Sequence, residues 1–440
     1  MKYQHLRIAV FCCLVGLLSS CALFRKSEKS AREVPPPEKS QPLPPEKTNE
    51  KKTLPPPFNV PAFAKVVHKP VYNVALFAPL YVDNVVDTSF SENSTQPLPA
   101  NVLPGLELYE GVRMALDSLR SEGIALRLYV YDTKSSSKPL NNILQNGQLD
   151  SADLILGAVS SDELTQLSNY AKQKEINFVS VTYPNDGGIK DNPFLTIVNS
   201  TLRTHCYAIQ DFAQQKFTNQ QILVLRQNTA QGKRNAEYIQ QAYQHMQFAR
   251  KVPIEIIDWD ENATAQQIAT HLSTAKNNVV IVTALYSNVA EDVIRKLATL
   301  GSTYAINVIG MPTLDGQNVL LQPDFKGVNI YYSTPYFNSG NEASSRSFIL
   351  SFFHQYRARP SDMAFKGFEA MYYFAHLLHD GGVYFNRNMN DRSGNFINAY
   401  NFQPVYGEED AQSDQSVPDY FENKHLYFVQ VRDSVISRAN

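Results

Sequence analysis

Two adjacent hydroxyl side chains, Ser160 and Ser161, stand at a point of the chain that could hold an anion. They follow the apolar segment 152–156 and open a helical pattern over 161–172. Hydroxyl and free backbone N–H groups at a helix N-terminus attract a carboxylate, because the helix dipole is positive there. The same stretch reads Ser-Ser-Asp-Glu, which is also a capping box that needs no ligand. Both interpretations stay open, since one hydroxyl cannot fully serve a cap and a ligand.

Three tyrosines end other predicted strands, and a ring at such a place could stack on a ligand. They are Tyr81, Tyr183 and Tyr286, and Thr182 adds a hydroxyl beside the second of them. The chain contains 24 tyrosines, so ordinary packing at strand ends explains three of them more simply.

No catalytic or metal-binding motif stands out in the chain. It has no Gly-x-Ser-x-Gly, no His-Glu-x-x-His and no Cys-x-x-Cys. His376 and His379 lie three residues apart in a helical pattern, but leucines separate them, which favours a surface or capping role over a metal. We therefore expect a protein that is not an enzyme and holds no cofactor and no metal.

The elements that must position these residues alternate between strand and helix. Residues 71–80 are almost continuously apolar and end at a proline, as in a strand covered on both faces of a parallel sheet. The first set of predicted strands continues at 125–131, 152–156, 176–182 and 194–198, and a second set lies at 221–226, 252–258, 278–284 and 305–310. Two successive sets predict two doubly wound, Rossmann-like α/β lobes.

A third segment follows the two sets. It contains a strand at 328–333, helices at 344–356 and 363–380, and a closing strand at 425–432. A segment of this kind after two lobes suggests that the chain returns to complete both sheets.

The order of four stretches resembles the type I periplasmic binding-protein fold, the family of branched-chain amino-acid-binding proteins and receptor ligand-binding regions. The stretches are LYEGVRMALD at 108–117, LILGAVSS at 154–161, the unit 286–301 with VIGMP at 308–312, and FKGFEA at 365–370. The resemblance covers about residues 71–440, nearly all of the predicted folded part.

This resemblance implies two lobes joined by a hinge of three crossings, near residues 200, 311 and 420. Lobe 1 would comprise 69–200 and 311–420, and lobe 2 would comprise 201–310 and 421–440. It also implies that Ser160, Ser161 and Thr182 bind the carboxylate and ammonium groups of an amino-acid-like ligand. Two features depart from the family pattern: the loop 83–104 is long and polar, and the turn 228–232 lacks the acid and the tyrosine often found there.

The N-terminus predicts export and a lipid anchor. An apolar run at 8–18 follows Lys2 and Arg7, and it is shorter than the about 20 residues that span a bilayer. Leu18-Ser19-Ser20-Cys21 resembles a lipobox, which implies a signal peptide over 1–20 and acylation of Cys21. The alternative is an ordinary signal peptide that happens to contain a cysteine.

Residues 21–68 are rich in proline, lysine and glutamate and show no apolar periodicity. Such a segment favours extended, disordered chain, and it could reach on the order of 140 Å as a tether. Ala22 follows the anchor where an aspartate would retain a Gram-negative lipoprotein in the inner membrane. We therefore expect the outer membrane, with the folded part in the periplasm.

Composition narrows the partners. The net charge of −2 implies neither nucleic acid nor an anionic membrane surface. With Cys12 and Cys13 in the signal peptide and Cys21 acylated, Cys206 would be the last cysteine, so no intramolecular disulfide forms.

Two functions remain open from the sequence. The first is a lipid-anchored solute-binding protein that closes two lobes on a small polar ligand, resembling an amino acid or a peptide. The second is a ligand-free scaffold or regulator of cell-wall synthesis or envelope assembly that binds an envelope protein.

Overall fold

The computed structural model describes residues 60–85, 98–218, 220–246, 251–390, 397–407 and 417–439. The chain divides into two units, Met1–Pro55 and Pro56–Asn440, and all described residues belong to the second. The predicted signal peptide, Cys21 and the tether up to residue 59 lie outside the described residues, as does the middle of the loop 83–104. No helix within the described ranges is long and apolar enough to cross a membrane.

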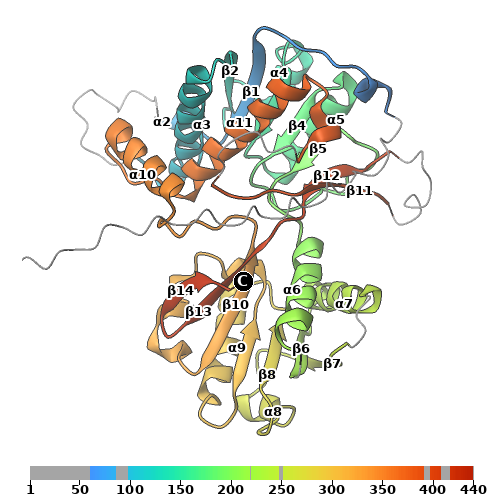
Figure 1. Ribbon diagram of the computed structural model, residues 1–440, viewed down its shortest axis with the longest axis vertical. Coiled ribbons are helices and arrows are strands. Elements are labelled where there is room, and N and C mark those ends of the chain that lie inside the picture. Colours follow the sequence, from blue (N-terminus) through green and yellow to red (C-terminus); the bar gives the residue numbers. More distant parts are fainter. Residues whose placement is uncertain are drawn as a thin grey trace, which may run out of the picture. The chain divides into compact units, whose positions relative to one another are not determined.

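The first lobe is built on a seven-stranded sheet in the order β11-β12-β5-β4-β3-β1-β2 (Figure 1). Its pairs are parallel except β11 with β12. The strands are β1 (Tyr72–Ala78), β2 (Leu126–Asp132), β3 (Leu154–Gly157), β4 (Asn177–Ser180), β5 (Leu195–Ile197), β11 (Phe402–Val405) and β12 (Tyr420–Asn423).

The second lobe has its own seven-stranded sheet, in the order β14-β13-β10-β9-β8-β6-β7. Its pairs are parallel except those made by β13. The strands are β6 (Gln221–Gln227), β7 (Ile254–Trp259), β8 (Asn278–Val282), β9 (Ile306–Ile309), β10 (Val328–Thr334), β13 (Tyr427–Arg432) and β14 (Val435–Arg438). The two doubly wound lobes predicted from the strand–helix alternation are therefore confirmed.

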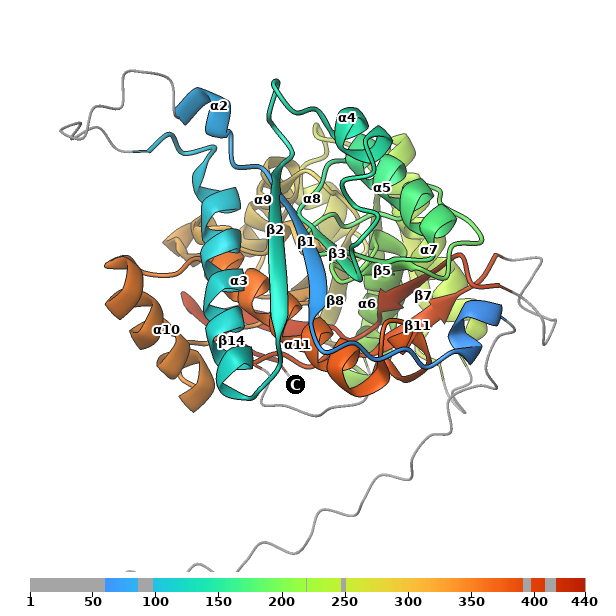
Figure 2. The same cartoon turned by 90° about the horizontal axis from the view of Figure 1, so that it is seen from above.

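Helices cover both faces of the first sheet, as Figure 2 shows from above. Along β1, Val74 and Leu76 face the core beneath α3 (Leu103–Ser121) and α11 (Asp362–Gly381), while Ala75 and Phe77 face the core beneath α4 (Leu140–Gln145) and α5 (Ser161–Lys174). Because successive strand residues point to opposite faces, a strand buried on both must be apolar throughout. The remaining helical segments of this lobe are η2 (Pro61–Ala64), α2 (Val82–Val85), α10 (Ala343–Tyr356) and η6 (Phe385–Asn388).

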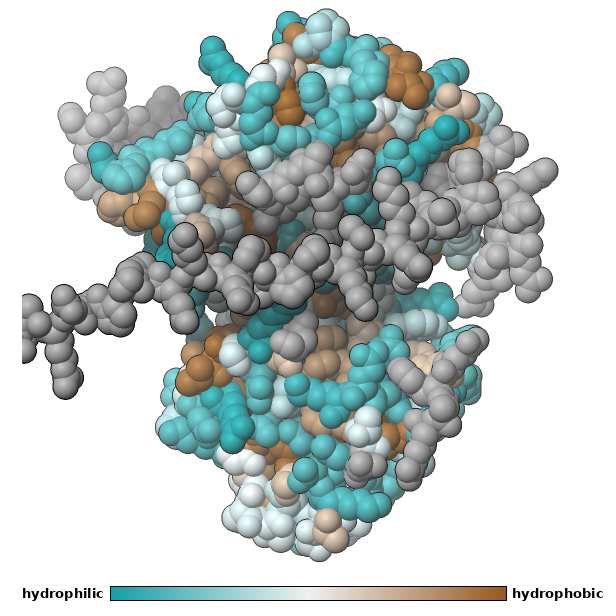
Figure 3. Space-filling view, in the orientation of Figure 1, coloured by the Kyte–Doolittle hydropathy of each residue, from teal (hydrophilic) through white to brown (hydrophobic). Residues whose placement is uncertain are grey.

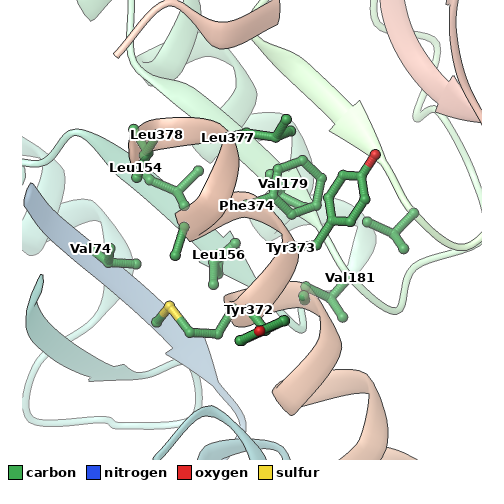
Figure 4. Close-up of a cluster of buried hydrophobic side chains, with 14 of the residues drawn as sticks. Val74, Leu154, Leu156, Val179, Val181, Tyr372, Tyr373, Phe374, Leu377 and Leu378 are labelled. Carbon is green, nitrogen blue, oxygen red and sulfur yellow. The ribbon is translucent and has the colours of Figure 1, made fainter. Parts of the chain in front are cut away.

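Helix α11 lies in the first core and touches α3 at two glycines. Figure 4 shows Phe374, Leu377 and Leu378 packed among sheet residues such as Leu154 and Val179. A Cβ added to Gly111 of α3 would stand 1.9 Å from the carbonyl oxygen of Ala364, and one added to Gly367 of α11 would stand 2.1 Å from that of Leu108. Both glycines belong to the stretches that carry the family resemblance, and their physical role is this close approach of two helix backbones.

The second sheet is covered in the same manner. Helices α6 (Leu202–Lys216) and α7 (Ala230–His245) pack on one face, and α8 (Ala265–Ala269) and α9 (Ser287–Thr299) on the other. Three short 3-10 helices connect β9 to β10: η3 (Pro312–Leu314), η4 (Asn318–Leu321) and η5 (Pro323–Phe325).

The second crossing between the lobes lies later than the sequence predicts. The sequence predicts the segment 311–334 in lobe 1, but β10 pairs with β9 and β13 of the second sheet. The 3-10 helices carry Leu314, Leu320 and Phe325 into the second core, which holds this segment there. The chain thus crosses after Thr334, in addition to crossing between β5 and α6 and between β12 and β13.

The folded part also begins earlier than predicted. The sequence predicts a tether up to residue 68, but Ala62 and Phe63 are buried in the first core. Phe63 packs edge-on against Phe194 at 5.3 Å between ring centroids. The carbonyl of Val67 accepts a hydrogen bond from the backbone N–H of Val383 at 3.0 Å. The burial of the Phe63 ring holds this segment in the fold, although its composition, rich in proline and lysine, predicts a disordered tether.

Candidate functional site

The turn at Ser160 is closed by the protein's own acid. Ser160 is the N-cap of α5, and Glu163 completes a capping box by accepting the backbone N–H of Ser160 at 2.7 Å. Lys134 forms an ion pair with the same carboxylate at 2.9 Å. Ser160 and Ser161 themselves are exposed. The helix end that could receive a ligand carboxylate therefore already holds one.

The turn after β1 is closed in the same way. Asp132, at the end of β2, accepts the consecutive backbone N–H groups of Leu80, Tyr81 and Val82 at 2.9, 3.1 and 2.8 Å. Tyr81 has a left-handed backbone with φ of 54°, which turns these groups toward one acceptor. The N–H groups of this turn could bind an anion, but the carboxylate of Asp132 already occupies that position.

Asp83 is a second acid near this turn whose carboxylate accepts backbone N–H groups. The backbone N–H groups of Ser136 and Ser137 donate to its carboxylate at 2.8 and 3.0 Å. The hydrogen bond from Ser137, helped by those from Ser136 and Ser135, lowers the pKa of Asp83 to about 2. The start of the long loop 83–104 is thus fastened to the segment that follows β2.

The predicted ligand residues share sheet edges but do not form one pocket. Tyr81, the two serines and Thr182 follow the adjacent strands β1, β3 and β4, whereas Tyr286 follows β8 of the other sheet and is 70% exposed. Tyr183 is half-buried against the core beneath α5. The carbonyl of Thr182 accepts a hydrogen bond from the side chain of Asn199 at 2.7 Å. As ligand contacts, these six residues stay a prediction.

A cavity of about 300 Å³ lies where strand ends of both sheets meet the hinge. None of the six predicted residues lines it. From the first lobe it takes residues after β4 and β5 and one residue of α11, and from the second lobe residues of α6, residues after β8 and β9, and the last residue of β10. The second crossing adds Pro335 and Tyr336. Its lining consists of Pro184, Asn185, Asn199, Ser200, Leu202, His205, Leu285, Pro312, Thr313, Asp315, Thr334, Pro335, Tyr336 and Lys366.

Lys366 brings a cation to this cavity from the first lobe. Its Nζ stands 4.7 Å from the ring centroid of Tyr336, in cation–π geometry. Tyr336 donates its hydroxyl to the carbonyl of Val181 at 3.4 Å, and burial raises its pKa well above the ordinary value. The phenol is therefore neutral, and the positive charge of the cavity comes from Lys366.

Asp315 brings an anion from the second lobe. The residue as a whole is exposed, while burial of its carboxyl group and the neighbouring carboxylate of Asp362 raise its pKa; the Thr334 hydroxyl and Lys366 act in the opposite direction. The Thr334 hydroxyl lies 2.8 Å from Asp315 Oδ2 and 3.0 Å from the Tyr336 carbonyl. The carboxyl group is thus held by the strand end at which the second crossing starts.

His205 adds no charge to the cavity. It is buried, its Nδ1 lies 2.8 Å from the hydroxyl of Ser333, and burial lowers its pKa to about 3. The ring is therefore neutral near pH 7.

A buried carboxyl group lies behind Tyr336. Glu369 of α11 accepts the backbone and side-chain N–H groups of Asn398 at 2.6 and 2.7 Å, and Asn398 in turn accepts the backbone N–H of Phe337 at 2.8 Å. Burial raises the pKa of Glu369 to about 7, against the opposing effect of Asn398. The second crossing is thereby tied to α11.

The first and third crossings are also bonded to each other. Glu422 of β12 accepts the backbone N–H of Thr201 at 2.7 Å, and the Ser200 hydroxyl donates to the Asn423 carbonyl at 2.6 Å. Lys424 Nζ donates hydrogen bonds to the Glu422 carboxylate at 2.6 Å and to the Thr204 hydroxyl at 2.8 Å. Ser200 of the cavity lining therefore belongs to a hydrogen-bonded set of residues that joins two crossings.

Lys366 and Asp315 were missed by the sequence reasoning, although signals for both were present. Lys366 stands inside the FKGFEA stretch, and Asp315 follows the VIGMP stretch at the end of a predicted strand. Their 51-residue separation hid the fact that they share one cavity.

No metal site accompanies the cavity. The described ranges contain no group of three or more His, Cys, Asp or Glu side chains that could hold an ion. His376 Nε2 lies 3.0 Å from Oε2 of Glu122 on α3.

Comparisons with known proteins agree with this architecture. Residues 103–393 match the family model described as periplasmic binding protein. No curated protein matches the chain.

Solved structures share the fold at low sequence identity. A putative branched-chain amino acid ABC transporter from Rhodospirillum rubrum has a TM-score of 0.60 at 15% identity, covering 84% of this chain and 99% of that one. A branched chain amino acid ABC transporter periplasmic ligand-binding protein from Burkholderia xenovorans has a TM-score of 0.55 at 11% identity, covering 84% and 94%. An ABC transporter substrate-binding protein from Sphaerobacter thermophilus has a TM-score of 0.54 at 14% identity, covering 84% and 96%.

Proposed function

Because the chain belongs to the periplasmic binding proteins, a family of non-enzymatic binding proteins, we propose that it closes two lobes on a small polar ligand resembling an amino acid or a peptide. The observation that carries this proposal is the cavity of about 300 Å³, whose lining comes from strand ends of both sheets. Ligands of open α/β sheets bind beyond the carboxyl ends of the strands.

The lining suits a ligand of this class. Leu202, Leu285 and three prolines offer apolar contact, and Asn185, Asn199 and Thr313 offer hydrogen-bonding groups. Small-molecule sites combine such apolar walls with a few polar groups that fix orientation. The names of the solved Rhodospirillum and Burkholderia proteins, both of the branched-chain amino acid type, make amino acids the first probes to try.

The test is a thermal-shift screen of the twenty amino acids and a set of dipeptides, followed by calorimetry of the hits. A solute that binds only the folded protein at 100 times its Kd stabilises it by about 2.7 kcal/mol. Absence of any hit, together with unchanged small-angle scattering in every condition, would refute the solute-binding proposal.

The same proposal includes a lipid anchor at Cys21 and an outer-membrane location facing the periplasm. It is supported by the Leu-Ser-Ser-Cys sequence at 18–21 and by Ala22. Metabolic labelling with a radioactive fatty acid should mark the wild-type chain and not the Cys21→Ser variant, and membrane fractionation should report the location. Labelling of both chains, or of neither, would contradict an anchor at Cys21.

A second candidate is a ligand-free scaffold or regulator in the envelope. The observation that favours it is the filling of the Ser160 and β1 turns by Glu163 and Asp132. Affinity capture from envelope extracts should then recover a cell-wall synthase or an assembly machine, and the solute screen should find nothing. Recovery of no such partner would count against this candidate.

A further inference from the structure

The described strands leave four sheet edges, and three of these edges carry a feature that hinders pairing with a further strand. Strand β11 contains Pro404, which has no N–H group to donate, and β14 is only four residues long. Strand β7 exposes the charged side chains of Glu255 and Asp258. Proline, short length and charge are common protections of an edge that would otherwise act as a template for another strand.

The fourth edge strand, β2, lacks these protections over its middle. Its seven residues read Leu-Arg-Leu-Tyr-Val-Tyr-Asp, so four uncharged residues, 128–131, separate the two charges. Tyr129 and Val130 are 38% and 39% exposed, and β1 is the sole strand partner of β2 among the described residues. Figure 2 looks onto this edge of the first sheet, and no described helix or strand crosses β2 there. The first lobe therefore presents an open and largely uncharged edge.

The hydrogen bonds to β1 show which backbone groups of β2 point away from the sheet. Tyr72 donates its N–H to the carbonyl of Ala125 at 3.1 Å, and Thr133 donates its N–H to the carbonyl of Ala78 at 3.0 Å. A parallel ladder uses alternate residues of a strand, so the odd-numbered residues of β2 face β1. The even-numbered residues turn their N–H and C=O groups outward. They are Leu126, Leu128, Val130 and Asp132.

The outward groups in the middle of β2 are unsatisfied by the chain itself. Within the ranges that the structure describes, the backbone N–H and C=O groups of Leu128 and Val130 make no hydrogen bond outside a strand ladder, and β1 takes only the odd-numbered residues. Backbone groups of this kind are best satisfied by a strand laid alongside them.

We propose that β2 pairs with β2 of a second copy of this chain in an antiparallel ladder, which joins the two first-lobe sheets into one. Centred on Tyr129, the middle residue of the strand, this pairing places Leu128 opposite Val130 of the second copy. Both residues have outward groups, so each such pair exchanges two hydrogen bonds. The end with Arg127 then meets the end with Asp132 of the second copy, whereas a parallel pair would bring like charges together.

The exposed side chains of β2 are covered in this pairing. Tyr129 lies on the two-fold axis, in a pair of residues that are not hydrogen-bonded to each other and whose Cα atoms lie about 4.5 Å apart. The two phenol rings therefore contact each other across the axis. On the other face of the sheet, Val130 contacts Leu128 of the second copy. One strand is thus complementary to itself, which favours a second copy over an unrelated partner.

The dimer leaves the hinge of each copy free. In the strand order of the first sheet, β2 stands at one edge, and β12, which leads into the third crossing, stands next to the opposite edge. Pairing at β2 therefore joins two first lobes and attaches neither second lobe. The dimer goes beyond the proposed solute binding and does not depend on it.

Analytical ultracentrifugation of the full-length chain in a mild detergent measures the dimer. We expect a Kd on the order of 10 μM for the wild type, as for a small reversible interface. Tyr129→Lys places two like charges opposite each other and should weaken the dimer about 10-fold. Val435→Lys adds the same charge to the exposed edge strand β14 and should change the Kd less than twofold.

Cysteine variants test the register of the pair. Tyr129→Cys places two thiols on the axis with Cα atoms about 4.5 Å apart, a separation that a disulfide bond accepts. Arg127→Cys places them about 14 Å apart, which a disulfide bond cannot span. Under a Cu(II)–phenanthroline oxidant, Tyr129→Cys should form a covalent dimer, and Arg127→Cys should not exceed the wild type, whose four natural cysteines set the background. Thermal unfolding verifies that each variant is folded, and the cysteine pair decides the matter if Tyr129→Lys fails to fold.

Three results would overturn this dimer. The first is a wild-type chain that is still monomeric at about 200 μM, 20 times the expected Kd. The second is a dimer that Val435→Lys weakens as much as Tyr129→Lys does. The third is equal cross-linking of the two cysteine variants. None of these results changes what the solute screen finds, so the proposed function is tested separately.

Discussion

The Ser160 turn and the hinge cavity both lie at carboxyl ends of parallel strands, but they differ in what satisfies their polar groups. At the turn, Glu163 accepts the N–H of Ser160 and is itself paired with Lys134. In the cavity, neither Lys366 nor Asp315 has an ion-pair partner among the described residues. A helix N-terminus is thus less available to a ligand carboxylate where an acid of its own first turn already accepts an N–H group there.

The largest effect should come from a change at the contact that positions Lys366. Gly367→Ala places a methyl group against the Leu108 backbone, and we expect a loss of about 3 kcal/mol in the free energy of unfolding. Urea denaturation measures it. Gly381→Ala on the same helix is the matched control, because its methyl group would meet only the Cβ of Phe385, at 3.1 Å. Equal losses in both variants would contradict the backbone contact.

The next effect concerns pH and the carboxyl group behind the cavity. The folded-state pKa of Glu369, about 7, lies above its ordinary value of 4.5, so between these values the folded protein binds the proton more tightly than the unfolded chain. This group's contribution to the free energy of unfolding therefore falls as pH rises from 4.5 to 7, by on the order of 3 kcal/mol.

Urea titrations at pH 5, 6, 7 and 8 should show this fall in the wild-type chain relative to Glu369→Gln, which carries no titratable group. Parallel pH profiles of the two proteins would rule out the raised pKa. This test concerns the buried carboxyl group behind Tyr336 in the cavity. The substitution does not change the Ser160 turn.

A smaller effect is expected at the turn itself. Glu163→Ala removes the acceptor of the Ser160 N–H and the partner of Lys134, and should cost about 1 kcal/mol of stability. If the ligand binds in the hinge cavity and not at this turn, Ser160→Ala and Ser161→Ala should change the affinity for the best ligand of the solute screen less than twofold. Calorimetry beside Lys366→Met measures this, and a tenfold loss from either serine variant would reverse the comparison.

The smallest expected change concerns His205, whose ring should not titrate near neutral pH. Since burial lowers the pKa of His205 to about 3, its ring should stay neutral from pH 5 to 8, with constant ring nitrogen shifts in NMR spectra. A shift change within that range would mean that the cavity holds a third titrating charge.

None of the large exposed hydrophobic residues in the described part of the chain lines the cavity. Hydrophobic residues are scattered among hydrophilic ones over the described surface visible in Figure 3. Among the large exposed ones, Leu350 and Phe353 lie on α10 and Val435 lies on the edge strand β14. The cavity remains the place where polar and apolar groups of both lobes converge.

Local chemistry made much of this molecule readable from its sequence. Apolar runs such as 71–80 predict strands buried on both faces, and the alternation with helices predicts two parallel sheets. The Ser-x-x-Glu spacing at 160–163 predicts a cap, and the cap is present. These features depend on neighbours in the chain, so a single sequence contains them.

Contacts between distant segments were decided only by the tertiary structure. Strand β10 joined the second sheet because Leu314, Leu320 and Phe325 pack in its core, and Phe63 entered the first core despite its proline-rich surroundings. Asp315 and Lys366 line one cavity because the chain passes from the second lobe to the first at a point between these two residues. Periodicity reports which face of an element is apolar, but the partner of that face is set by packing across the whole chain.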